Sequence, residues 1–299
     1  MGESMKKTVI IVSIICLIFC FAGCGEKDPA PQSTKAIETT KPIPTTTTSE
    51  QPQTTKPTTR PTTKPTKPTE TTEPKNISEN NIVIVLDPGH DTDNDSRNHP
   101  DLGLNEQDIN LKIALACRDR LNKYDGVTVY MTREDGSCPN AAGKYSTNGE
   151  YEDCILARTS FAEDKKADLY VSLHCNASTG EMTEGSGGAE VYVSVYPEFN
   201  QKFTPLGEMI LNNISSRTGI YSRGVQTRTK PEKGTYKDGT VKDYYYLLSN
   251  NVDNGRPAII VEHAFMDKTF DNSVLKDDNK LKALGEADAD AIADFYGLG

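Results

Sequence analysis

The segment at residues 82–90, which reads IVIVLDPGH, constrains the fold more than any other part of the sequence. Its uninterrupted apolar run, mostly β-branched, predicts a strand that is buried on both faces of a sheet. Asp87-Pro88-Gly89 then ends the strand, because proline removes a backbone donor and glycine permits a positive φ. The chain therefore presents His90 at the carboxyl end of a buried strand, which is where open α/β sheets bind ligands.

The rest of residues 81–299 alternates between strand and helix patterns. Strands are predicted at residues 82–86, 127–131, 168–173, 189–194, 244–248 and 258–261. Helices are predicted at residues 106–123, 154–166, 203–217 and 279–295. This alternation predicts a single α/β domain, whose mostly parallel, twisted sheet of about six strands is flanked by helices on both faces.

The first 80 residues predict export rather than a folded domain. Lys6 and Lys7 precede an apolar run at residues 9–21, which is shorter than the ~20 residues that span a bilayer, so residues 1–23 are expected to be a signal peptide. Cys24 follows small residues in a pattern that resembles a bacterial lipobox, although Phe21 stands where Leu is usual. That resemblance implies lipid attachment to Cys24; ordinary secretion and an uncleaved anchor are the alternatives.

Residues 24–80 are rich in Thr and Pro and lack the apolar side chains that a packed core requires. We expect a disordered linker that holds residues 81–299 away from a membrane. The whole chain has a formal charge of −10, and because residues 1–80 carry +2, residues 81–299 carry −12. A domain this acidic lacks the basic surface of a nucleic-acid-binding protein, so no nucleic-acid partner is expected.

Four of the seven cysteines fall within the predicted domain. Cys138 and Cys154 bracket a polar segment, and an exported protein can close such a loop with a disulfide. Cys117 lies on the apolar stripe of a predicted helix and is expected in the core. The sequence contains no CxxC motif, which argues against a thiolate zinc site.

His90, His174 and Glu262 each follow a predicted buried strand, and the ends of parallel strands lie along one edge of a sheet. Glu106 stands in the first turn of the helix after His90, where it can point back to that edge. Two histidines and one glutamate are a ligand set of catalytic zinc, and a further carboxylate can serve as the general base. The residues alone leave open which glutamate binds the metal.

Several sequence blocks in this order resemble the zinc-dependent N-acetylmuramoyl-L-alanine amidases that cleave bacterial peptidoglycan. The blocks are LDPGH with the glutamate of LNEQDINL, then DLYVSLHCNAS, GGAEVYVS, SRGVQ and IIVEHAF, which together span residues 81–299. The resemblance implies that His90, Glu106 and His174 bind one zinc ion and that Glu262 is the catalytic base. It also implies hydrolysis of the amide between N-acetylmuramic acid and L-alanine. Together with the expected lipid on Cys24, this would take place at the outer face of the cell membrane.

The chain departs from the family pattern at several positions. Asp91 and Thr92 stand where a glycine is usual, and Cys175, which replaces an alanine, is expected to be a core residue. His263 is expected to have a structural or supporting role, and Arg158 is expected to form a structural ion pair. Residues 134–153 and 227–243 look inserted; we expect solvated loops, with walls of a glycan or peptide groove as the alternative.

Two further functions are compatible with these residues. One keeps the zinc but makes the chain a peptidase or a deacetylase of cell-wall material. The other is a lipoprotein that binds the wall without turnover. In every case we expect a monomer whose partners are peptidoglycan and, through the lipid, the membrane.

Overall fold

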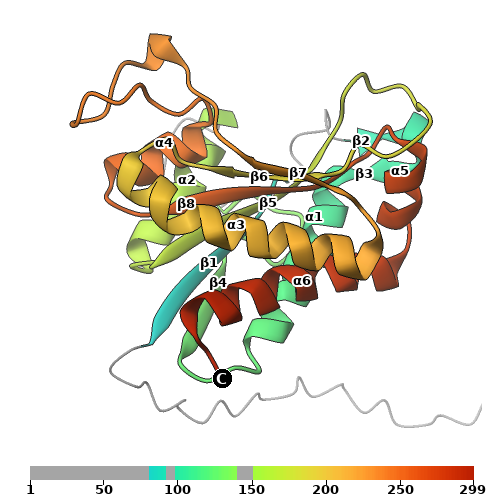
Figure 1. Ribbon diagram of the computed structural model, residues 1–299, viewed down its shortest axis with the longest axis horizontal. Coiled ribbons are helices and arrows are strands. Elements are labelled where there is room, and N and C mark those ends of the chain that lie inside the picture. The colour runs from blue at the N-terminus through green and yellow to red at the C-terminus, as the bar shows by residue number, and fades with distance from the viewer. Residues whose placement is uncertain (1–80, 92–97, 140–150) are drawn as a thin grey trace, which may run out of the picture. The chain divides into compact units, whose positions relative to one another are not determined.

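The computed structural model describes residues 81–91, 98–139 and 151–299 (Figure 1). The expected signal peptide at residues 1–23, the lipidation site at Cys24 and the linker at residues 24–80 lie outside the described residues. Within the described ranges, no helix is both long enough and apolar enough to cross a membrane.

A six-stranded sheet forms the centre of the domain, in the order β4-β1-β5-β8-β6-β7. Its strands are β1 (Ile82–Pro88), β4 (Val127–Met131), β5 (Leu169–Asn176), β6 (Ala189–Val193), β7 (Ser222–Gln226) and β8 (Ala258–Phe265). Strands β4, β1, β5 and β8 run parallel, whereas β6 is antiparallel to β8 and parallel to β7. A second, two-stranded sheet pairs β2 (Asn98–His99) with β3 (Leu104–Asn105) around a 3₁₀ turn at Pro100–Leu102. The predicted α/β class with a mostly parallel sheet is confirmed.

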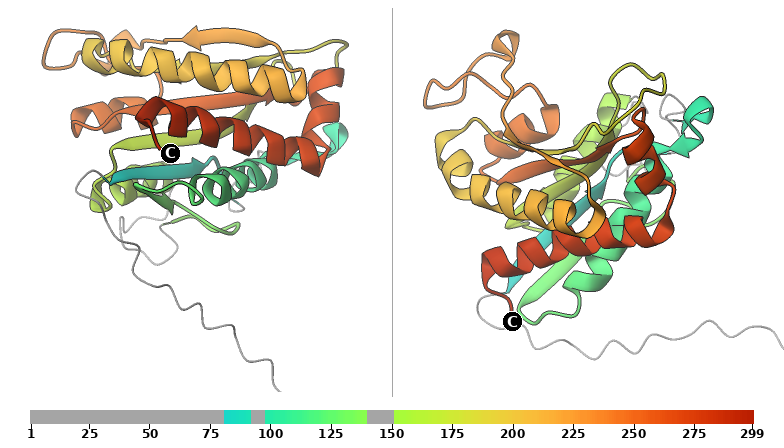
Figure 2. Two further views of the ribbon diagram at one scale, coloured as in Figure 1. Left: turned by 60° about the horizontal axis from the view of Figure 1, so that its bottom comes forward. Right: turned by 45° about the vertical axis from the view of Figure 1, so that its right-hand side comes forward.

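Helices α1 (Glu106–Leu121), α3 (Pro197–Thr218) and α6 (Asp278–Tyr296) cover one face of the sheet (Figure 2). Helices α2 (Tyr151–Asp164) and α4 (Tyr246–Asp253) pack together on the other face, and α5 (Thr269–Leu275) follows β8. Each face has its own buried apolar cluster. The domain therefore has the helices on both faces that the alternating pattern predicted.

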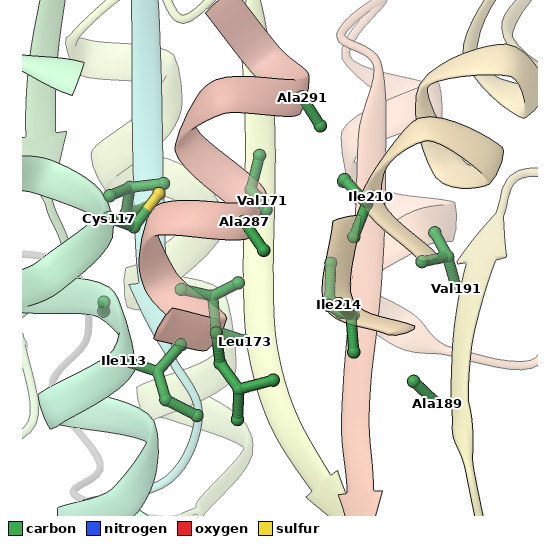
Figure 3. Close-up of a cluster of buried hydrophobic side chains, with 14 of the residues drawn as sticks. Ile113, Cys117, Val171, Leu173, Ala189, Val191, Ile210, Ile214, Ala287 and Ala291 are labelled. Atoms are coloured by element: carbon green, nitrogen blue, oxygen red, sulfur yellow. The ribbon is translucent and has the colours of Figure 1, made fainter. Parts of the chain in front are cut away.

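The larger core lies between the sheet and α1, α3 and α6 (Figure 3). Ile113 of α1 and Leu173 of β5 are completely buried there, since the apolar residues of α1 recur every four positions and share one face of the helix. Gly285 of α6 permits close contact with α1, because a Cβ atom there would lie 2.2 Å from the carbonyl oxygen of Ile113. This packing fixes α1, and with it the position of Glu106 at its first residue.

One predicted strand was wrong and one strand was missed. Residues 244–248 do not form a strand; the chain enters helix α4 at Tyr246, where Leu248 and Val252 form the buried face. Their aromatic and branched side chains favour a strand, but packing against the sheet decides the outcome. The sixth strand is instead β7, whose polar, glycine-containing sequence gives a weak strand signal and which pairs only with β6 at the sheet edge.

Candidate metal centre and catalytic carboxylate

The side chains of His90, Glu106 and His174 meet at the carboxyl end of the central strands. Nε2 of His90 lies 3.1 Å from Oε1 of Glu106, and Nδ1 of His174 lies 3.4 Å from the same oxygen. The three candidate ligand atoms all lie within 4.8 Å of one another. Ligands of a tetrahedral zinc ion at ~2.0–2.1 Å are separated by about 3.3 Å, so this donor set fits zinc.

Glu262 lies beside this cluster, on the neighbouring strand. Its Cα is the register partner of His174, so the two side chains project from the same face of the sheet. Its Oε2 atom is buried and accepts no hydrogen bond from any described residue. Burial raises the pKa of Glu262 to about 7; the charge of His174 opposes this shift, whereas the charges of Glu106 and Glu190 add to it. A carboxyl group that titrates near neutrality is suited to proton transfer.

Two buried arginines hold the turn that carries His90. Arg133 donates to the carbonyls of Pro88 and Gly89, each at 2.9 Å, and Arg158 donates to the carbonyl of His90 at 2.7 Å. His90 itself has φ +60°, a left-handed conformation that is uncommon for residues other than glycine. The arginines satisfy the carbonyls of this turn and thereby stabilise the unusual backbone that points the imidazole at Glu106.

Asp87 balances the charge of Arg158 beneath the turn. Its completely buried carboxylate lies 2.7 Å from the Arg158 guanidinium and accepts hydrogen bonds from Thr132 at 2.6 Å and Ser172 at 2.7 Å. Burial alone would raise the pKa of Asp87, but the charge of Arg158 and the hydrogen bond from Thr132 hold it well below its usual range. Arg158 therefore forms the structural ion pair expected from the sequence. Arg133 was missed, although it follows a predicted strand as His174 does.

Glu106 is held by groups from its own helix and from β5. Asn110, one turn further along α1, lies 3.4 Å from Oε1, and the backbone N–H of Cys175 donates to the same atom at 3.3 Å. Burial opposes ionisation of Glu106, yet the hydrogen bonds from His174 and His90 hold its pKa well below the usual range. Glu106 therefore stays anionic, as a metal ligand must. Asn110 could have been found from sequence, since it follows Glu106 by four residues in a helix.

His263 supports the site from the opposite face of β8. Nδ1 of His263 lies 3.0 Å from the carbonyl oxygen of His174, and Nε2 lies 2.9 Å from the carboxylate of Asp288 on α6. The carbonyl oxygen can only accept, so Nδ1 of His263 carries a proton and donates to it. Burial lowers the pKa of His263, but Asp288 outweighs it and the net pKa is raised. His263 thus has the supporting position that the sequence suggested.

Cys138 and Cys154 are joined by a disulfide, with their Cα atoms 6.0 Å apart. The carboxylate of Asp91 lies next to Cys154 and 3.1 Å from Arg158. Asp91, Cys138 and Cys154 are also close enough together to share a metal, but the two sulfurs form a disulfide and are therefore not thiolate ligands. Part of the segment at residues 134–153 lies outside the described residues. Cys175 is buried, as expected for a core residue.

A cavity of about 800 Å³ opens over the metal cluster and Glu262. Part of its lining comes from a hairpin that we call the cationic hairpin, residues 227–243, which projects between β7 and α4 (Figure 1). Arg228, Lys230 and Lys233 of this hairpin line the cavity. The insertion is therefore largely exposed, as a solvated loop is, and it also contributes three side chains to the cavity wall; that this wall belongs to a glycan or peptide groove stays a prediction.

Comparisons with known proteins identify relatives of this chain and of its fold. N-acetylmuramoyl-L-alanine amidase CwlM of Bacillus licheniformis is 24% identical over 218 residues, which cover 73% of this chain and 70% of CwlM. The solved structure of Cwp6 from Clostridium difficile has a TM-score of 0.57 and 30% identity, over 73% of this chain but only 30% of Cwp6.

The catalytic domain of CwlV, an amidase from Bacillus (Paenibacillus) polymyxa var. colistinus, shares the fold, with a TM-score of 0.54 and 19% identity over 73% of this chain and 99% of that domain. Residues 84–294, which include all four site residues, match the family described as N-acetylmuramoyl-L-alanine amidase. The chain therefore belongs to the N-acetylmuramoyl-L-alanine amidase family.

Proposed function

We propose that this chain is a zinc-dependent N-acetylmuramoyl-L-alanine amidase that hydrolyses the amide between the lactyl group of N-acetylmuramic acid and L-alanine. One observation carries the proposal: two imidazoles and an anionic glutamate converge within 4.8 Å beside a buried carboxyl group with a pKa near neutrality. Family membership supplies the substrate class.

Each residue has a distinct part in the proposed reaction. His90, Glu106 and His174 would hold one zinc ion, and zinc when bound polarises the amide carbonyl and lowers the pKa of water. The Glu262 carboxylate accepts the proton of the attacking water and returns it to the leaving amine of L-alanine. Glu262 can do both because its Oε2 is not committed to another described group. No described Ser or Cys is needed as a nucleophile.

We further propose that the chain is an exported lipoprotein. In this arrangement residues 1–23 are removed, Cys24 carries the lipid, and residues 24–80 tether the domain to the outer face of the membrane. The Thr/Pro-rich composition of the linker and the lipobox-like Cys24 support this proposal. A monomer is sufficient, because the four site residues all come from one chain.

Digestion of purified peptidoglycan, with and without a chelator, tests the function. We expect mass spectrometry to show released stem peptides with a free L-alanine amino group and no new reducing sugar ends. Cleavage should stop when the chelator is added and return with zinc. New peptide termini within the stem would instead identify a peptidase, and loss of acetyl groups would identify a deacetylase. Binding to peptidoglycan without any cleavage product would identify a wall-binding lipoprotein.

A further inference from the structure

The cavity over the metal cluster contains an excess of positive charge that the proposed hydrolysis does not use. Among the described residues that line it, the carboxylates are Glu106 and Glu262, both already assigned to the site. The remaining charged side chains are Arg228, Lys230 and Lys233, all from the cationic hairpin. Residues 81–299 carry a formal charge of −12, so a cluster of three cations here stands out against the rest of the domain.

These three cations lack carboxylate partners among the described residues, since no ion pair within 4.0 Å joins them to an Asp or Glu. Lys242, on the same hairpin, does have such a partner, because its Nζ lies 2.6 Å from Asp253. Burial lowers the pKa of Lys233, and the neighbouring charge of Lys230 lowers it further. The charge of Asp243 opposes this shift, but no carboxylate of the described residues forms an ion pair with any of the three cations.

Aromatic side chains and the hairpin backbone hold the cations in place. The Arg228 guanidinium lies 3.7 Å from the centre of the Tyr244 ring, a cation–π contact that restrains the side chain. Nζ of Lys233 donates to the carbonyl of Tyr244 at 2.7 Å. The two arms of the hairpin are joined by backbone hydrogen bonds from Lys230 to Lys242 at 2.9 Å and from Tyr244 to Arg228 at 2.7 Å.

The base of the hairpin is tied to the sheet through Asp243. This completely buried carboxylate accepts hydrogen bonds from Ser194 and Tyr236, each at 2.6 Å, and from the backbone N–H of Val195 at 3.0 Å. The arms therefore leave the domain at a fixed point, next to the end of β6. Preorganised cations lose little conformational freedom on binding an anion, which favours recognition.

We propose that Arg228 and Lys230, supported by Lys233, form a subsite for a free carboxylate of the stem peptide, on residues that follow the L-alanine of the scissile amide. This inference rests on the proposed function and names the form of substrate that the chain prefers. Arg228 supplies two parallel N–H donors, a geometry that matches a carboxylate and is lost when the group is a neutral carboxamide. The chain therefore discriminates against peptidoglycan whose stem carboxylates are amidated.

The test compares two synthetic muramoyl peptides that differ only in carrying free carboxylates or carboxamides after L-alanine. For the zinc-loaded protein we expect kcat/KM to be about tenfold higher for the carboxylate peptide, mainly through KM, since a hydrogen bond to a charged group changes binding by at least this factor. In the double variant Arg228→Gln/Lys230→Gln the ratio should fall to about one. The matched control is Lys237→Gln, an exposed cation of the same hairpin outside this cavity, which should keep the wild-type ratio.

Direct binding to the zinc-loaded Glu262→Gln variant separates this inference from the proposed function. The subsite is supported if this variant binds the carboxylate peptide about tenfold more tightly than the carboxamide peptide and loses this preference when Arg228 and Lys230 are also replaced. This result supports the subsite even if neither peptide is cleaved. Equal binding of the two peptides overturns it, as does a preference that survives the double substitution. Competition by glycerol phosphate as strong as that by the carboxylate peptide would also overturn it, in favour of a phosphate-bearing wall polymer.

Discussion

In the proposed mechanism Glu262 moves a proton whereas the three candidate ligands hold the metal, and one substitution at Glu262 separates these two roles. Glu262→Gln keeps the size of the side chain but removes the proton acceptor, so we expect about one zinc per chain to remain bound while kcat falls by about 10²–10⁴-fold. Metal analysis and the rate of release of L-alanine amino groups measure the two effects. Glu208→Gln, an exposed change on α3, is the control. Full activity of zinc-loaded Glu262→Gln would show that another group is the base.

Gly89 permits the close packing of the His90 turn against His174. A Cβ atom at Gly89 would lie 2.2 Å from the His174 ring, so Gly89→Ala must displace this imidazole. We expect zinc affinity to fall by at least about tenfold in a protein that still folds, as competition with a chromogenic chelator would show.

The control is Gly187→Ala, where the added Cβ would lie 2.2 Å from the ring of Phe265 and not from a candidate ligand. Both variants should lower the melting temperature, but only Gly89→Ala should lose zinc. Equal zinc affinities would contradict the assignment of His174 as a ligand.

At the scale of elements, the buried pair of His263 and Asp288 ties β8 to α6 directly behind the site. Asp288→Asn removes the carboxylate that raises the pKa of His263 and binds its imidazole in a completely buried position, so we expect the free energy of unfolding to fall by about 3 kcal/mol. Asp278→Asn on the same helix is the matched control: its pair with Lys112 is largely exposed and should contribute less than about 1 kcal/mol. Urea unfolding of both variants measures the difference.

Asp290 joins three helices on the same face of the sheet and gives this packing a predictable pH dependence. Its carboxylate lies 2.6 Å from both Arg120 of α1 and Arg217 of α3, and Tyr124 donates to it at 2.8 Å. Partial burial raises the pKa of Asp290, but these hydrogen bonds outweigh it and lower the pKa to about 2.

Because the folded-state pKa of Asp290 lies below the ordinary value of 3.8, its contribution is present above about pH 4 and is lost as the pH falls toward 2. Solvent screening limits the effect, so Asp290→Asn should lower the free energy of unfolding by about 1 kcal/mol at pH 6. The difference from wild type should shrink between pH 4 and pH 2. A difference that does not change with pH would show that the ion pairs are not its source.

At the scale of the whole molecule, the fold followed from local patterns wherever one strong signal dominated. The buried strand before His90 and the four-residue repeat of α1 predicted both elements, and the rule for parallel strand ends placed His90, His174 and Glu262 at one edge. The helical start at residues 246–248 and the edge strand β7 were not predictable from the sequence. Helix packing and edge pairing depend on neighbours that are distant in sequence.

The sequence predicted which side chains converge at the candidate site, but not the residues that support them. The turn of His90 depends on Arg133 and Arg158, which lie more than 40 residues further along the chain, so only the folded structure brings them together. The same holds for the cationic hairpin, whose charges looked like those of any solvated loop until the fold placed them over the cavity.

The proposed lipid tether would decide where the domain can act, and substitution of Cys24 tests it. Cys24→Ala removes the only sulfur that the lipobox-like pattern assigns to lipid, so we expect the protein to leave the membrane fraction, appear in the medium and lose label from radioactive fatty acid. Cys20→Ala, within the same apolar run, should remain labelled and membrane-bound. Because residues 81–299 contain all four site residues, the released Cys24→Ala protein should still cleave soluble muramoyl peptides at the wild-type rate. Retention of Cys24→Ala in the membrane would instead identify residues 9–21 as an uncleaved anchor.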